Sequence, residues 1–242
     1  MSRRVCLVTG GTSGIGEAFV RALHARGDAV HFCARSGNAV AALEAVLPGT
    51  TGHVCDVTSD DAIAAMVEQV AGDAGRIDLL VANAGRLEER DFTTAPLDAD
   101  ALAAEVALNL ASPILTVNRC LPLLRRAERA TIVLVGSGYG WSPSGRAPVY
   151  SAAKAGVRMF AKALRAQLAP VGVHVMELAP PTVDTPATAH RSVAKLEPDA
   201  VVAAALAGVD RGRAAVLPGQ ARFLPVGLRV APAAIERMTL KS

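Results

Sequence analysis

Apolar and polar residues follow two different periods along this chain. Short runs of apolar residues are separated by longer segments in which Ala, Leu, Glu and Arg recur at helical spacing. The short runs predict seven strands, at 5–9, 29–34, 52–56, 79–82, 131–137, 173–178 and 214–217. The longer segments predict helices at 15–27, 39–47, 60–74, 98–126 and 149–171.

Strand and helix alternate through most of the chain, which is typical of an α/β protein. The pattern predicts a Rossmann-type, doubly wound parallel sheet of about seven strands with helices on both faces. Strands that are almost entirely apolar fit a sheet buried on both sides. Residues 138–148, rich in Pro, Ser and Gly, are predicted to form a loop rather than a domain boundary. The whole chain, 1–242, is therefore expected to be one domain.

Two later segments interrupt this alternation. Residues 180–195 contain three prolines and little periodicity. They predict an irregular flap after a strand, where α/β proteins place ligand loops. The C-terminal segment, 196–242, predicts one helix at 198–207 and another at 223–238 that is broken near Pro232. The second helix region has arginines among apolar residues, which favours packing on the domain or another subunit over a membrane-surface helix.

Composition narrows the class of protein. The chain is 51% hydrophobic and 19% charged, which is too apolar for a disordered protein. The net charge of +3 is modest and unclustered, so no nucleic-acid surface is expected. No apolar run approaches the ~18 residues of a membrane span. The four cysteines form no CxxC pair, which favours buried thiols and predicts no metal site.

The N-terminus has an arginine pair at 3–4 that superficially resembles a twin-arginine export signal. The apolar run after it, 5–8, is shorter than the apolar region of a signal peptide and meets Thr9-Gly10-Gly11 at once. A strand in a cytoplasmic protein is the favoured interpretation.

A glycine-rich loop, Thr9-Gly10-Gly11-Thr12-Ser13-Gly14-Ile15-Gly16, joins the first predicted strand to the first helix. Gly10 permits a tight turn, Gly14 lets backbone approach a pyrophosphate, and Gly16 allows the helix to pack close to the strand. The helix N-terminus then offers free N–H groups to phosphate. The position between strand and helix predicts a dinucleotide site more strongly than the glycines alone.

The spacing Gly10-x-x-x-Gly14-x-Gly16 resembles the TGxxxGxG signature of the short-chain dehydrogenase/reductase family. Other family motifs follow in order up to Thr185: Asp56, Asn83-Ala84-Gly85, Asn109, Ser137, Tyr150, Lys154 and a PGxVxT-like stretch from Pro180. Three positions depart from the family pattern. Ala82 replaces the first Asn of NNAG, Gly136 stands where many relatives have a second Ser, and Pro181 replaces the Gly of the PG motif.

The resemblance implies a nicotinamide dinucleotide cofactor. The residues expected to bind it are Gly10, Thr12, Ser13, Gly14, Ile15, Gly16, Arg35, Ser36, Asp56, Val57, Asn83, Ala84, Gly85, Tyr150, Lys154, Pro180, Val183 and Thr185. The second strand ends at Arg35 and Ser36, without the acid that usually binds the ribose of NAD. A guanidinium can pair with a 2′-phosphate, so NADP(H) is predicted over NAD(H). The alternative is that Arg35 lies in solvent at the end of the strand.

Tyr150 and Lys154 are four residues apart in a predicted helix and therefore share a face. A nearby ammonium favours the phenolate form of a tyrosine. In the family, this Tyr transfers the substrate proton and this Lys also binds the nicotinamide ribose. The resemblance further implies that Ser137 binds the substrate oxygen and that Asn109 supports the Lys through a water and holds a helix kink. Taken alone, the Tyr–Lys pair also fits a surface pair.

The substrate is expected at the carboxyl ends of the strands, with Arg86, Tyr139, Trp141 and Pro181 as candidate contacts. Trp141 either shapes an apolar pocket or covers its loop. The predicted function is that of an NADP(H)-dependent ketoreductase or alcohol dehydrogenase acting on a small carbonyl or alcohol. The alternative is a non-catalytic NADP(H)-binding redox sensor or scaffold. The resemblance implies a homodimer or homotetramer.

Two other enzyme classes are disfavoured. A serine hydrolase needs a G-x-S-x-G elbow, and the residues around Ser137 lack that frame. An epimerase or dehydratase of the extended kind needs a larger C-terminal substrate domain than the residues after Thr185 provide.

Overall fold

A computed structural model describes residues 3–94, 96–189 and 193–241 of the chain. It contains a parallel sheet of seven strands in the order β3-β2-β1-β4-β5-β6-β7. The strands are β1 (Val5–Thr9), β2 (Ala29–Ala34), β3 (Thr51–Val54), β4 (Leu79–Ala82), β5 (Ala130–Val135), β6 (Val173–Leu178) and β7 (Ala215–Val216). The predicted doubly wound α/β fold is confirmed.

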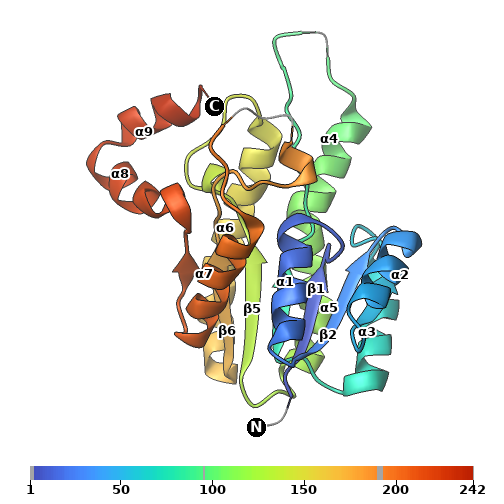
Figure 1. The fold of residues 1–242 in the computed structure, drawn as a ribbon. Coiled ribbons are helices and arrows are strands. Elements are labelled where there is room, and N and C mark those ends of the chain that lie inside the picture. Colours follow the sequence, from blue (N-terminus) through green and yellow to red (C-terminus); the bar gives the residue numbers. More distant parts are fainter. Residues whose placement is uncertain (1–2, 95, 190–192, 242) are drawn as a thin grey trace.

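Helices cover both faces of this sheet (Figure 1). On one face lie α1 (Gly14–Ala25), α2 (Gly37–Val46) and α7 (Pro198–Asp210), whose buried residues form one apolar cluster with the strands. On the other face lie α3 (Asp60–Ala74), α5 (Ser112–Leu124) and α6 (Pro148–Leu168), which form the second cluster. Both clusters are mainly aliphatic, with Phe19 and Phe32 fully buried in the first. Burial on both faces explains why the strands are nearly all apolar.

The segment predicted as one helix at 98–126 consists of three parts. Helix α4 (Ala99–Val106) passes through a π-helical turn (Ala107–Ala111) into α5. By length and composition this continuous helix could cross a membrane. Its second half instead packs on the sheet, since Val117, Cys120 and Leu124 are buried there. It is therefore a core helix of the α/β fold. π-Helical turns are frequent at functional sites, and this one surrounds Asn109.

The predicted strands at 52–56 and 131–137 extend beyond the observed ones. β3 ends at Val54 and β5 ends at Val135, so Asp56 and Ser137 lie in the loops that follow. In a parallel sheet these loops gather at one edge, where the chain leaves the strands. The sequence pattern could not separate the last strand residue from the first loop residue, because Val54 and Cys55 are both apolar and Val135 and Gly136 are both buried.

The C-terminal segment returns to this carboxyl edge. After β7, a 3₁₀ turn (Gly219–Phe223) leads into α8 (Leu224–Val230) and α9 (Pro232–Thr239). The break expected near Pro232 therefore separates two helices. α8 and α9 lie beside the upper end of α6 in Figure 1, away from the sheet. α9 contacts the loop before α6, where the hydroxyls of Ser142 and Thr239 are 2.7 Å apart.

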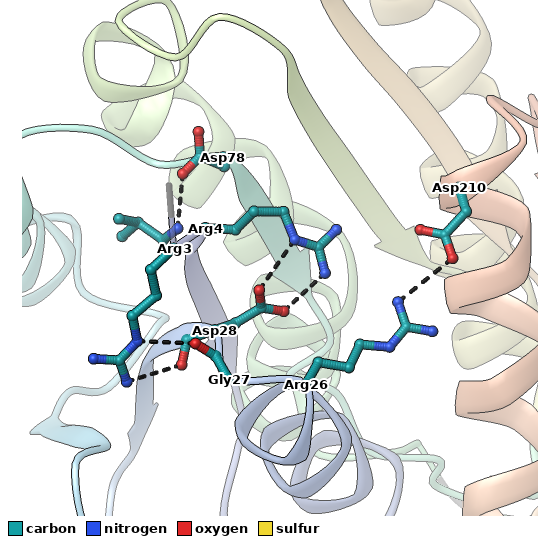
Figure 2. Close-up of polar contacts among 8 residues, drawn as sticks. Arg3, Arg4, Arg26, Gly27, Asp28, Asp78 and Asp210 are labelled. Atoms are coloured by element: carbon teal, nitrogen blue, oxygen red, sulfur yellow. Dashed lines mark hydrogen bonds and ion pairs between the residues drawn. The ribbon is translucent and has the colours of Figure 1, made fainter. Parts of the chain in front are cut away.

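The amino-terminal edge of the sheet is closed by polar contacts (Figure 2). The guanidinium of Arg4 binds both oxygens of Asp28, at 3.1 and 2.7 Å. Arg3 donates to the carbonyls of Gly27 and Asp28, and the N–H of Val5 donates to Asp78 at 2.7 Å. The arginine pair at positions 3 and 4 thus fixes the start of β1 in the folded protein.

Candidate active site

A cavity of about 700 Å³ lies at the carboxyl edge of the sheet. Its walls come from the glycine loop, the ends of the first six strands, the start of α6, the flap after β6 and the C-terminal segment. Most of the residues predicted to bind cofactor or substrate line it: Gly10, Thr12, Ser13, Gly14, Ile15, Arg35, Ser36, Val57, Asn83, Ala84, Gly85, Arg86, Ser137, Tyr139, Tyr150, Lys154, Pro180, Pro181, Val183 and Thr185. Gly16, Asp56, Asn109 and Trp141 are not among its lining residues.

The glycine loop needs its glycines for steric reasons. Gly10 and Gly14 have φ angles of +66° and +52°, which side chains rarely adopt. A Cβ on Gly16 would lie 2.0 Å from the carbonyl oxygen of Gly10, so α1 can approach the loop only with glycine there. Asn83 holds the loop from the end of β4, since its amide donates to the carbonyl of Thr9 at 2.9 Å. Positive φ, close backbone packing and an open cavity above fit a bound pyrophosphate.

The ends of β2 and β3 form one wall of the cavity. Arg35 is exposed there, beside Ser36, whose hydroxyl caps α2 by accepting from the N–H of Ala39. The carboxylate of Asp56 accepts from the N–H and the hydroxyl of Thr58, at 2.9 and 2.7 Å. These hydrogen bonds are the main cause that lowers the pKa of Asp56, with a smaller effect from the charge of Arg35. Asp56 is therefore an ionised group one residue before the cavity wall at Val57.

Lys154 is a buried cation at the centre of the site. It is 3% exposed, and its Nζ donates to the carbonyl of Val135 at 2.9 Å. The same Nζ lies 5.6 Å from the centre of the Tyr150 ring, as expected for residues one helical turn apart. Burial lowers the pKa of Lys154 from 10.5 to about 8. The ammonium form therefore still predominates at neutral pH.

Ser137 begins the short turn that follows β5, a 3₁₀ turn (Gly138–Gly140). Its hydroxyl accepts from the N–H of Tyr139 at 3.1 Å, and both residues line the cavity. The N–H of Gly138 donates to the carbonyl of Pro180 in the flap at 2.9 Å. A Cβ on Gly140 would lie 2.6 Å from the carbonyl oxygen of Lys154, so this turn packs directly on α6. Ser137, Tyr150 and Lys154 thereby line the same cavity.

The side chain of Asn109 hydrogen-bonds to backbone groups near the site. Its amide donates to the carbonyls of Arg86 and Glu105, at 2.9 and 3.1 Å, and its oxygen accepts from the N–H of Arg86 at 3.0 Å. The buried Asn109 therefore ties the loop after β4 to the π-helical turn. Asn109 lies within this π-helical turn, at the position where a helix kink is predicted. The predicted water link to Lys154 stays a prediction.

Trp141 corrects one expectation about the substrate site. Its indole N–H donates to the carboxylate of Glu177 at 2.9 Å, and the guanidinium of Arg158 lies 3.6 Å from the centre of its ring. Glu177 belongs to β6 and Arg158 belongs to α6. Trp141 is therefore not a cavity wall. The sequence left open whether Trp141 shapes an apolar pocket or covers its loop, and these contacts favour the second alternative.

Sequence reasoning missed the contribution of the C-terminal segment to the cavity. Gln220, Ala221, Leu224, Met238 and Thr239 all line it. No local motif marks these residues, because only the return of the chain after β7 brings them to the cavity. Cys33 and Cys55 were also missed; they line the cavity from the ends of β2 and β3, and both are free thiols.

The parallel sheet and a cavity lined by the glycine loop, Ser137, Tyr150 and Lys154 are typical of a dinucleotide-binding oxidoreductase. Residues 4–195 match the family model described as short chain dehydrogenase, and the chain belongs to that family. It is 34% identical over 185 residues to the uncharacterized oxidoreductase DltE of Bacillus subtilis, covering 76% of this chain and 73% of that protein.

Two further relatives refine this placement. The chain is 38% identical over 189 residues to a putative ketoacyl reductase of the monensin polyketide synthase of Streptomyces virginiae, covering 76% of this chain and 72% of that protein. The structure of the present chain resembles that of a short chain dehydrogenase of Burkholderia cenocepacia, which was solved in complex with NADP. That similarity has a TM-score of 0.88 at 26% identity and covers 100% of this chain and 99% of the other.

Proposed function

We propose that this oxidoreductase interconverts a carbonyl compound and its secondary alcohol with NADP(H), using Tyr150 as the proton donor and acceptor. The observation that carries the proposal is the meeting of Ser137, Tyr150 and Lys154 at the wall of the cavity that also receives the glycine loop. In this proposal Ser137 donates a hydrogen bond to the substrate oxygen, and Tyr150 transfers the proton.

Each of these residues has a separate task. A bound nicotinamide supplies or accepts the hydride. Lys154 places a positive charge beside the Tyr150 ring, which stabilises the phenolate left after the proton is given up. The carbonyl of Val135 holds that ammonium in place, and burial strengthens its field. The fixed turn after β5 keeps the Ser137 hydroxyl at the same wall, so that substrate orientation needs little rearrangement.

The preference for NADP(H) rests on Arg35. It lies at the cavity wall formed by the end of β2, where a 2′-phosphate of the adenosine ribose would be expected. The neighbouring hydroxyl of Ser36 offers a further hydrogen bond. The relative from Burkholderia cenocepacia was solved with NADP, which is consistent with this assignment.

The proposed substrate class rests on the other residues that line the cavity. Leu87, Pro181, Leu224 and Met238 line the cavity with apolar side chains. Polar lining comes from Tyr139, Gln220, Thr239 and Arg86, whose guanidinium is paired with the carboxylate of Glu88. Desolvating a charged or heavily hydroxylated substrate against the apolar residues is costly. We therefore propose an uncharged ketone or aldehyde with an apolar substituent.

A paired screen tests this function. Ketones and aldehydes of increasing apolar size are offered with NADPH, and a matched set of sugars and keto acids serves as the control. Oxidation of NADPH by the apolar set supports the proposal, and a preference for the sugars or keto acids contradicts the substrate class. Binding of NADPH without turnover of any carbonyl would instead favour a sensor or scaffold.

A further inference from the structure

β6 contains an acidic residue that its neighbours do not explain. Four of its six residues, Val173, Val175, Met176 and Leu178, are buried and apolar, yet Glu177 is also buried, with 2% of its surface exposed. Burying a carboxylate is costly, and an apolar residue of similar volume is often no less stable at such a position. The acid therefore calls for a contact that an apolar residue could not make.

That contact is the indole of Trp141. The Oε1 atom of Glu177 accepts from its N–H at 2.9 Å. The guanidinium of Arg158 also stacks on this indole, 3.6 Å from the centre of the ring. The ring is thus held by a hydrogen bond at its edge and a cation on its face.

The space for this carboxylate comes from one of the departures from the family pattern. A Cβ on Gly136 would lie 3.2 Å from the Oε1 atom of Glu177, which is tighter than ordinary contact. Glycine at 136 and glutamate at 177 therefore fit each other across β5 and β6. Gly136 directly precedes Ser137, so the carboxylate lies next to the backbone that carries the serine.

We propose that Glu177 is a positioning residue that fixes the turn Ser137–Trp141 through Trp141, and so sets where Ser137 and Tyr139 lie in the cavity. The turn is also fastened at Gly138 by the flap and at Gly140 by α6. Glu177 supplies a further attachment, at the end of the turn. The consequence for catalysis rests on the function proposed above, whereas the attachment itself does not.

Fluorescence tests the attachment directly, because Trp141 is the only tryptophan in the chain. Glu177→Gln keeps an acceptor oxygen, and Glu177→Met removes it at similar length. We expect acrylamide to quench the wild type and Glu177→Gln alike, and to quench Glu177→Met more strongly. Equal quenching of all three proteins would overturn the proposal.

A pH titration provides a second readout that needs no destabilising variant. Burial raises the pKa of Glu177, and the hydrogen bond from Trp141 and the cations Arg158, Lys162 and Arg165 of α6 oppose this. Trp141 emission in the wild type should therefore change in one step as the carboxylate titrates. Glu177→Gln should lack the step. A wild type without a step, or a step that survives in Glu177→Gln, contradicts the proposal.

Kinetics test the consequence for the site. With a carbonyl substrate from the screen, Glu177→Met and Trp141→Phe should each lower kcat/KM about 10-fold, the loss of one charge-assisted hydrogen bond. The double variant should be no worse than either single one, and Glu177→Gln should recover most activity. The Kd for NADPH should stay unchanged. Stronger quenching in Glu177→Met with unchanged kinetics would show that the turn needs no such positioning.

Failure of the proposed function would look different. In that case the wild type itself binds NADPH and reduces no carbonyl, and quenching and titration alone decide whether Glu177 fixes the turn.

Discussion

Polar groups have different roles at the amino and carboxyl edges of this sheet. At the amino edge, Arg4 binds the carboxylate of Asp28 and Arg3 donates to backbone carbonyls (Figure 2). Asp78 accepts from the N–H of Val5 at the start of β1. At the carboxyl edge, the strands end in glycines and polar side chains around a cavity of about 700 Å³. One edge uses its polar groups for the fold and the other leaves them for a ligand. Substitutions at the two edges should therefore have separable effects, on stability and on function.

The largest effect is expected at Tyr150. Tyr150→Phe keeps the ring and removes the phenolic hydroxyl with its transferable proton, so kcat should fall by about 10²–10⁴-fold. The Kd for NADPH and the thermal midpoint should stay near those of the wild type. Tyr139→Phe is the matched control on the same cavity and should leave the pH dependence of kcat unchanged. Near-normal kcat in Tyr150→Phe would mean that another group transfers the proton.

The next effect concerns cofactor choice. Arg35→Ala removes a charge-assisted contact worth roughly 1.5–3 kcal/mol, so NADPH should bind about 10–100-fold more weakly. NADH should bind as before, because it lacks the 2′-phosphate. Calorimetric titration with both cofactors provides the measurement. If the wild type binds NADH more tightly than NADPH, the assignment of Arg35 is wrong.

A pH-dependent stability term is expected from Lys154 in the cofactor-free protein. Burial lowers its pKa from 10.5 to about 8, so the folded state binds fewer protons than the unfolded state between these values. Stability contributed by this residue should therefore rise as pH increases from about 8 towards 10.5.

Chemical denaturation of the wild type and Lys154→Met across this range measures that term. The difference in unfolding free energy, wild type minus variant, should increase with pH. Lys162→Met, which changes an exposed lysine on the same helix, is the control and should follow the wild type. A difference that stays constant with pH would refute the effect of burial.

At the amino edge the expected change is in stability alone. Asp28→Asn weakens the contact with Arg4, whose side chain is 35% exposed, so a loss of about 1 kcal/mol is expected. NADPH affinity should not change. Glu17→Gln, which breaks the exposed ion pair with Arg21, should cost less than about 0.5 kcal/mol. A changed Kd for NADPH in Asp28→Asn would contradict the claim that substitutions at the amino edge affect stability alone.

The smallest effect is expected at the C-terminal wall of the cavity. Met238→Ala removes apolar contact from a side chain that is already 61% exposed, so KM for the carbonyl should rise only about 2–5-fold. Neither NADPH affinity nor the pH profile should change. Val230→Ala, on the exposed helix α8 and outside the cavity lining, is the control. Equal KM values for both variants and the wild type would remove Met238 from the substrate wall.

Much of the fold and of the candidate site could be predicted from the sequence because the governing interactions are local. Apolar runs give the strands, and helical spacing places Tyr150 and Lys154 on one face. The glycine loop depends on φ angles and close packing within a few residues. Element ends were less exact, as at β3 and β5, since the last strand residue and the first loop residue are equally apolar or buried.

The tertiary structure decided the contacts between distant segments. Trp141 lies only four residues after Ser137, yet its direction depends on Glu177 in β6. Met238 lines the cavity because the chain returns over the carboxyl edge after β7. An acid in an apolar strand was visible in the sequence, but its partner was not. Periodicity describes which residues share a face of one element, and it contains no information about which remote element will pack there.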